Sequence, residues 1–193
     1  SSEPLYKDAF GPFTPGFKVV PFGDLEAVRA AINPNTAAVM LEPIQGENGV
    51  IVPPEGYLRG VADLCKQNQV LFIADEIQTG LGRTGKLFAS EYEGVRPDIT
   101  IIGKALSGGM LPVSAVLADE PILGLYQPSE HGSTFGGSPL ACAVGIAALD
   151  VIEEEKLAER AFTLGNYFMD RLSEIPSAHI KEVLDVDCSL VWS

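Results

Sequence analysis

Three stretches of the 193-residue chain carry side chains whose types and positions could do chemistry. Asp75 follows directly after the apolar run Val70–Ala74, and Lys104 lies two residues beyond the apolar run Ile99–Ile102. The third stretch, residues 131–139, reads HGSTFGGSP and combines small residues with hydroxyls. A carboxylate can hold a cation, a lysine amine can attack an aldehyde, and backbone N–H groups with hydroxyls can bind an anion.

Each of the first two stretches also has a purely structural interpretation. A carboxylate at the end of a buried strand costs several kcal/mol unless it is paired, so Asp75 either faces a cation or caps the next turn. Lys104 has apolar and small neighbours and no anion nearby in the sequence. Burial of a lysine amine frees it as a nucleophile, whereas a lysine on the surface extends its stem to solvent.

The third stretch offers the hydroxyls of Ser133 and Thr134 as anion ligands. Alternatively, it is a flexible Gly-Ser loop in which Ser138 caps a helix that begins at Pro139. His131 has no company of metal-ligand type, so we expect no zinc site. An acid for a ring nitrogen, a lysine for an aldehyde and hydroxyls for a phosphate are together the requirements of pyridoxal phosphate.

Short apolar runs alternate with helical patterns along the chain, which predicts an α/β fold with a largely parallel sheet. Strands buried on both faces are expected at 37–41, 70–74, 99–102 and 113–117. Helices are expected from the N-cap Asp24 to residue 32 and over 57–67, 139–152 and 157–175. Ligands of such sheets bind at the carboxyl ends of the strands, where Asp75 and Lys104 are expected.

The composition of the chain disfavours several classes of binding partner. Thirteen basic against 26 acidic residues give a net charge of −13, which disfavours binding to nucleic acid or to an anionic membrane. No apolar run approaches the roughly 20 residues that cross a bilayer, and the first residues do not resemble a signal peptide. Three cysteines without CxxC spacing fit a reducing cytoplasm. A nucleotide-binding domain is disfavoured because the phosphate-loop sequence GK[ST] is absent.

Four segments together resemble one known family. They are LEPIQGENGV (41–50), LFIADEIQTGLGRTG (71–85), GKALSGGMLPVSAV (103–116) and HGSTFGGSPLACAV (131–144). In this order they are similar to the class III, ornithine-type aminotransferases, which depend on pyridoxal phosphate and have the aspartate-aminotransferase fold (fold type I). The similarity runs from about residue 11 to residue 183. It implies the large domain of that fold, a mostly parallel sheet flanked by helices, incomplete at both ends.

The resemblance implies roles for individual residues. Lys104 would hold the cofactor covalently and later carry a proton, and Asp75 would pair with the ring nitrogen. Ile77 would pack on the ring, and Gln78 would hydrogen-bond its 3-oxygen. Ser133 and Thr134 would bind the phosphate, reaching it from the partner subunit of a homodimer. Glu47 would lie beside a substrate-site arginine, and Glu42 would lie at the edge of the site. Arg83 is expected to be structural.

The segments 10–25 and 130–161 are closer to the ornithine-specific members of the family than to the acetylornithine-specific ones. The implied reaction moves the δ-amino group of L-ornithine to a 2-oxo acid, with 2-oxoglutarate as the expected acceptor, and gives glutamate semialdehyde and glutamate. Acetylornithine as the substrate and a catalytically inactive fragment are the alternatives.

Members of the family are about twice as long as this chain. Residues 1–176 are therefore expected to form most of the large domain without its N-terminal part. Residues 177–193 would begin the small domain, with a strand near 179–183 and an atypical tail from residue 184. Because the family's phosphate-binding turn and its substrate arginine would lie outside such a chain, we expect these 193 residues alone to be inactive.

Overall fold

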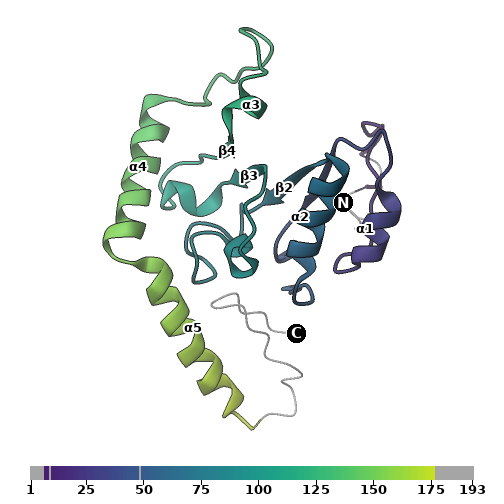
Figure 1. Ribbon diagram of the computed structural model, residues 1–193. Helices are drawn as coiled ribbons and strands as arrows, with labels where there is room; N and C mark the ends of the chain where they lie inside the picture. The colour runs from purple at the N-terminus through teal and green to yellow at the C-terminus, as the bar shows by residue number, and fades with distance from the viewer. Residues whose placement is uncertain (1–6, 9, 48, 177–193) are drawn as a thin grey trace.

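The computed structural model describes residues 7, 8, 10–47 and 49–176, and its elements run from α1 near the N-terminus to α5 (Figure 1). The expected domain boundary at 176/177, the strand near 179–183 and the atypical tail from 184 lie outside the described residues. None of the helices in the described part is long and apolar enough to cross a membrane.

A four-stranded sheet forms the centre of the molecule. Its strands are β1 (Ala38–Leu41), β2 (Leu71–Asp75), β3 (Ile99–Ile102) and β4 (Ala115–Ala118), and they lie in the order β1-β2-β3-β4. The first three are parallel, and β4 is antiparallel to β3. The predicted α/β fold with a mostly parallel sheet is confirmed. The fourth strand starts two residues later than predicted, because residues 113 and 114 still belong to the preceding loop.

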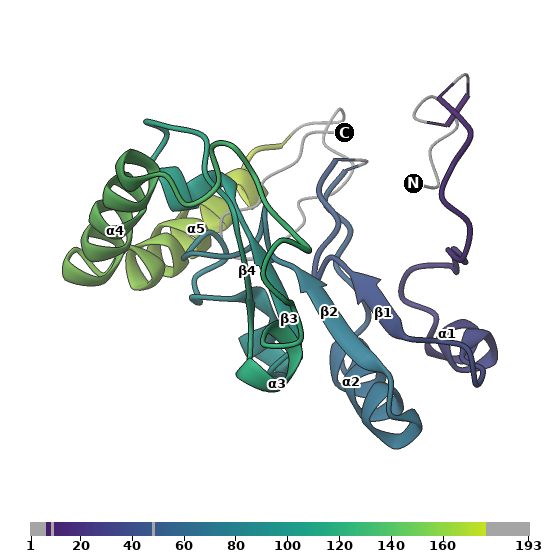
Figure 2. The same ribbon diagram turned by 90° about the horizontal axis from the view of Figure 1, so that it is seen from above.

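The helices at one end of the sheet follow their sequence signals closely. Helix α1 (Leu25–Ala31) begins where the Asp24 carboxylate accepts a hydrogen bond from the Ala27 backbone N–H at 2.9 Å. Helix α2 (Tyr57–Asn68) packs against β1 and β2, and α1 packs against α2. Figure 2 shows both helices at the β1–β2 end of the sheet. Both predicted helices are confirmed.

The main core lies between α2 and the sheet. It consists of buried apolar side chains from α1, α2, β2 and the adjoining turns: Val28, Tyr57, Leu58, Val61, Leu64, Cys65, Val70, Phe72 and Val95. A smaller core of Leu81, Ile102 and Leu106 lies beneath the turn that carries Lys104. The residues flanking Lys104 are thus held by packing.

Burial on both faces, which the apolar runs predict for every strand, is wrong for the two edge strands. Met40 in β1 is 54% exposed, and Val116 and Leu117 in β4 are 50% and 43% exposed. Helix α2 covers the sheet only at β1 and β2, and no other helix in the described part of the chain covers these side chains. A continuous apolar run predicts a strand whose two faces are both buried, but it does not indicate which other element buries them.

The chain after β4 forms a short helix α3 (Glu120–Leu123) and then two long helices, α4 (Pro139–Glu154) and α5 (Leu157–Ser173). We call α4 and α5 the helical arm, and it lies at the opposite end of the sheet from α1 and α2 in both views. Ser138 caps α4 by accepting from the Ala141 N–H at 3.4 Å, as predicted. Helix α4 packs against the 3₁₀ turn η3 (Lys104–Ser107).

Candidate active site at the carboxyl edge of the sheet

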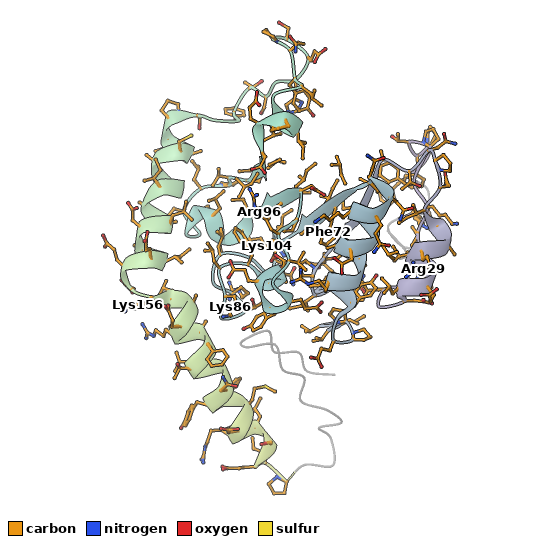
Figure 3. All side chains as sticks on the ribbon, viewed as in Figure 1. Arg29, Phe72, Lys86, Arg96, Lys104 and Lys156 are labelled. Atoms are coloured by element: carbon orange, nitrogen blue, oxygen red, sulfur yellow. The ribbon has the colours of Figure 1, made fainter. Side chains whose placement is uncertain are left out.

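Three of the predicted site residues follow three neighbouring parallel strands. Glu42 comes directly after β1, Asp75 is the last residue of β2, and Lys104 begins η3 two residues after β3. Because parallel strands end at the same edge of the sheet, these residues share that edge. The predicted placement of Asp75 and Lys104 at the strand ends is confirmed. Figure 3 shows Lys104 near the middle of the molecule.

The Lys104 amine contacts two of the other predicted residues. Lys104 Nζ donates a hydrogen bond to Gln78 Oε1 and lies 3.6 Å from Glu47 Oε1. The side chain of Lys104 is 53% exposed, and that of Glu47 is 74% exposed. Of the two interpretations of Lys104, the structure shows the exposed side chain, and the loop after β1 brings Glu47 to it as the anion that the neighbouring sequence lacks. An ion pair this exposed contributes about 0–1 kcal/mol, so it orients the amine more than it stabilises the fold.

The backbone at Lys104 adopts a conformation that costs energy. Its φ is +42°, in the left-handed region that a side chain with a Cβ disfavours by about 1–2 kcal/mol. The turn is held by the buried side chains of Leu106 and Ser107 and by the hydrogen bond from Leu106 N to Gly103 O at 3.0 Å. Such strain persists where the surroundings impose it and is common at functional positions.

Two neighbouring carboxylates, those of Asp75 and Glu76, lie at the end of β2 and have different hydrogen-bond partners. Glu76 is 1% exposed and accepts from Thr79 Oγ1 at 2.5 Å, Ala89 N at 3.0 Å and Ser90 N at 2.9 Å. Asp75 is partly buried and accepts from Ile77 N at 3.1 Å. No other hydrogen bond or ion pair to the Asp75 carboxylate is seen among the described residues. Both carboxylates thus hold the turn after β2: Glu76 binds three donors, and Asp75 caps the turn through Ile77 N while keeping acceptor capacity for a cation.

The role of Glu76 was missed at the sequence level, although a signal for it existed. Successive side chains of a strand point to opposite faces, so two neighbouring carboxylates at a strand end cannot face the same partner. Glu76 joins the turn after β2 to the 3₁₀ turn η2 (Ala89–Glu93), and this fixes the segment on which Asp75, Ile77 and Gln78 lie.

Ile77 lies beside the backbone that leads into Lys104. A methyl group placed on Gly103 would be 3.4 Å from Ile77 Cγ2 and 3.6 Å from Ser114 Cβ. Gly103 is buried between these side chains. Ile77 therefore lies beside the backbone of Gly103, the residue that precedes Lys104.

Glu42 is the carboxyl group of this edge whose protonation the structure changes. Burial raises the pKa of Glu42, and the negative charges of Asp75 and Glu47 raise it further. A hydrogen bond with the backbone of Gly46 and the positive charge of Lys104 lower it in part. Glu42 therefore takes up a proton at a higher pH than an ordinary glutamate.

Ser133 and Thr134 are not brought to this group within the single chain. Both are exposed, and Ser133 Oγ accepts a hydrogen bond from Gly136 N at 2.9 Å. No hydrogen bond links either residue to Lys104, Asp75 or Gln78 in the part of the chain that is described. The ring of His131 lies 5.6 Å from that of Tyr126, and the described residues hold no cluster suited to a metal ion.

Comparison with known proteins identifies the family. The family model for class III aminotransferases matches residues 1–187. The chain belongs to the class III aminotransferases. Among curated members, it is 60% identical over 183 residues to an ornithine aminotransferase of Bacillus subtilis (strain 168). It is 61% identical over the same length to ornithine aminotransferase 2 of Staphylococcus saprophyticus. Each match covers 95% of this chain and 46% of the relative.

Solved class III structures agree with the fold. An ornithine aminotransferase of Toxoplasma gondii superimposes with a TM-score of 0.94 at 47% identity, covering 96% of this chain and 45% of that one. An acetylornithine aminotransferase of Elizabethkingia anophelis gives a TM-score of 0.87 at 53% identity, covering 90% and 47%. The chain thus spans about half the length of the aminotransferases it matches and shares the fold of that part.

Proposed function

We propose that the chain is the lysine-bearing part of a pyridoxal-phosphate-dependent ornithine aminotransferase. One observation carries the proposal. The Lys104 amine is oriented by Gln78 and Glu47 at the strand edge where Asp75 ends β2. The curated relatives named above are called ornithine aminotransferases, and a Toxoplasma gondii structure is described with pyridoxal phosphate at its active site.

The residues present fit this cofactor. Lys104 offers a half-exposed amine for its aldehyde, and Asp75 has acceptor capacity for a protonated ring nitrogen. Ile77 offers an apolar side chain beside Gly103, and Gln78 offers an amide for a ring oxygen. Bound at this edge, pyridoxal phosphate would supply an electron sink for electrons released at the substrate carbon.

The chain's own groups then have defined tasks. Lys104 Nζ holds or releases a proton beside the substrate, and the Gln78 amide oxygen orients that nitrogen. The Asp75 carboxylate lies at the strand end, where it can accept a hydrogen bond from a cation. Glu47 gives Lys104 a counter-charge that can exchange for a substrate-site cation. The expected reaction is transfer of the δ-amino group of L-ornithine to a 2-oxo acid, with 2-oxoglutarate as the acceptor.

A homodimer is part of the proposal. Among the described residues, Ser133 and Thr134 are exposed and form no hydrogen bond with Lys104, as residues that serve a partner's phosphate site would be. The arm and its loop also expose large apolar side chains, namely Phe135, Leu140, Ile146, Leu164, Tyr167 and Phe168. A reducing cytoplasm is the proposed setting, because Cys65 and the exposed Cys142 are both free.

The deciding experiment is an absorbance titration of the purified chain with pyridoxal phosphate, with Lys104→Ala as the matched control. We expect a new visible band that borohydride converts into a covalent adduct, located on Lys104 by peptide mass. Stronger bleaching of the band by L-ornithine than by acetylornithine would identify the substrate and would contradict the expected inactivity of these residues alone. A band that is equally strong in Lys104→Ala would refute the assignment of the lysine.

Two other functions have specific support. Acetylornithine as the substrate is supported by the Elizabethkingia anophelis structure at 53% identity, and stronger bleaching by acetylornithine would establish it. A catalytically inactive chain is supported by the exposed apolar surface of the arm and by the separation of Ser133 and Thr134 from Lys104. Absence of any Lys104 adduct in a folded protein would establish the second.

A further inference from the structure

Gly46 lies directly against the side-chain amide of Gln78. A methyl group built on Gly46 would lie 2.0 Å from Gln78 Nε2, 2.5 Å from its Cδ and 3.0 Å from its Oε1. Atoms that are not bonded to each other do not approach this closely, because dispersion attraction between carbon atoms is optimal near 3.5–4.0 Å. The Gln78 amide therefore occupies the space that the Cβ atom of any other residue at position 46 would need.

Backbone conformation is not the reason for a glycine at this position. Gly46 is not one of the glycines with a positive φ, whereas Gly49, three residues later, has a φ of +99°. An alanine at position 46 would therefore fit the backbone. The three atoms nearest to such a methyl group all belong to the amide of Gln78.

Gly46 is also placed where the groups of the site converge. Its backbone hydrogen-bonds the Glu42 carboxylate, and the next residue, Glu47, forms the ion pair with Lys104. Gln78, the residue that Gly46 limits, is the hydrogen-bond acceptor for the same lysine amine. Gly46 thus lies against Gln78 and directly precedes Glu47, the two residues that bind the Lys104 amine.

We propose that Gly46 is a positioning residue that keeps the Gln78 amide oxygen on Lys104 Nζ. The consequence for amino-group transfer rests on the proposed function, while the contact itself does not. With any larger residue at position 46 the flexible end of Gln78 must move, and the hydrogen bond to Lys104 is lost. The glycine acts through Gln78 alone.

A double-mutant cycle on the 193-residue chain without cofactor tests this mechanism. The variants are Gly46→Ala, Gln78→Ala and the two combined. The readout is the rate of reductive methylation of Lys104 by formaldehyde and cyanoborohydride, measured by peptide mass relative to the exposed Lys66. Gly46→Ala is expected to raise the relative rate about two- to tenfold, the equivalent of one hydrogen bond. Gln78→Ala should raise it equally, and the double variant no further.

Gly145→Ala is the matched control. Its new methyl group would also be close to the Lys104 turn, but at ordinary contact distances of 3.7 Å from Leu106 O and 3.9 Å from Leu106 Cδ1. Added bulk without displacement of Gln78 should leave the Lys104 rate unchanged. A rate increase in this control equal to that of Gly46→Ala would overturn the proposal.

Two further results would also overturn it. In the first, Gly46→Ala reacts like the unmodified chain while Gln78→Ala reacts faster, so that the amide tolerates the methyl group. In the second, Gly46→Ala keeps its full effect when Gln78 is already alanine. If Gly46→Ala alone does not fold, the double variant decides: restored folding supports the contact, and continued unfolding contradicts it. Failure of pyridoxal phosphate to attach to Lys104 would remove the proposed function and leave this cycle intact.

Discussion

Helix α2 and the helical arm carry comparable apolar sequence patterns and bury them very differently. In α2, 12 residues long, Tyr57, Leu58, Val61, Leu64 and Cys65 are all buried. In α5, 17 residues long, Gly165 is the one buried residue, and Leu164 and Phe168 are 51% and 41% exposed. An apolar stripe at helical spacing shows which face of a helix can be buried. Whether that face is buried depends on whether another element of the described chain packs against it.

The largest expected contrast comes from one leucine in each region. Leu64→Ala in α2 should lower the free energy of unfolding by about 2–5 kcal/mol, because Leu64 is 3% exposed and its loss leaves a cavity. Leu164→Ala in α5 should cost less than about 1 kcal/mol, since half of that side chain is already in water. Urea denaturation followed by circular dichroism measures both. Equal losses would mean that the α5 face is covered in solution.

This contrast marks the limit of what the sequence predicts about the fold. The sequence predicts the four strands and the four longer helices to within a few residues, because apolar period and capping residues such as Asp24 and Ser138 are local signals. Exposure of Met40 and Leu164 was not predictable, because it depends on which other elements are present to cover them.

The cysteines give the second contrast. Burial, with a smaller contribution from the charge of Asp98, raises the pKa of the Cys65 thiol in α2 to about 11. Cys142 in α4 is exposed. At pH 8 the Cys65 thiolate is a minute fraction, and it grows tenfold per pH unit up to that pKa, so iodoacetamide should modify Cys142 at least about a hundredfold faster. Cys188→Ser simplifies the peptide mapping. Comparable rates at pH 8 would show that α2 opens readily.

In the candidate site, too, some features can be predicted from the sequence and others cannot. Asp75 and Lys104 could be predicted to share an edge, because each follows an apolar run and parallel strands end together. The contact of Glu47 with Lys104 and the contact of Gly46 with Gln78 depend on the path of the loop after β1, which no local pattern determines. The resemblance supplied Glu47 and Gln78 as site residues, and the structure brings both to the lysine.

The third contrast concerns how the helices begin. The Glu93 carboxylate, from η2, accepts from Gly56 N at 3.2 Å and from Arg59 N at 2.7 Å, and so caps α2 from a distant segment. At the start of α5, the side chain of the N-cap residue Lys156 makes no such hydrogen bond in the described part of the chain. Glu93→Ala should lower the free energy of unfolding by about 1 kcal/mol, as the loss of a cap does, whereas Glu91→Ala on the same turn should not. Thermal unfolding compares the two, and equal effects would remove the capping role.

The smallest expected effect concerns the N-cap residues of α2 and α5. Both N-cap residues have left-handed backbone, but α2 has Gly56 with φ 80°, whereas α5 has Lys156 with φ 51°. A lysine in this region costs about 1–2 kcal/mol that a glycine avoids, and the greater freedom of glycine in the unfolded chain removes part of that gain. Lys156→Gly should therefore stabilise the protein by about 0.5 kcal/mol, and Gly56→Ala should destabilise it by about 1 kcal/mol. Urea midpoints of both variants test the pair. A loss of stability in Lys156→Gly would mean that the lysine contributes more to the arm through its side chain than its backbone costs.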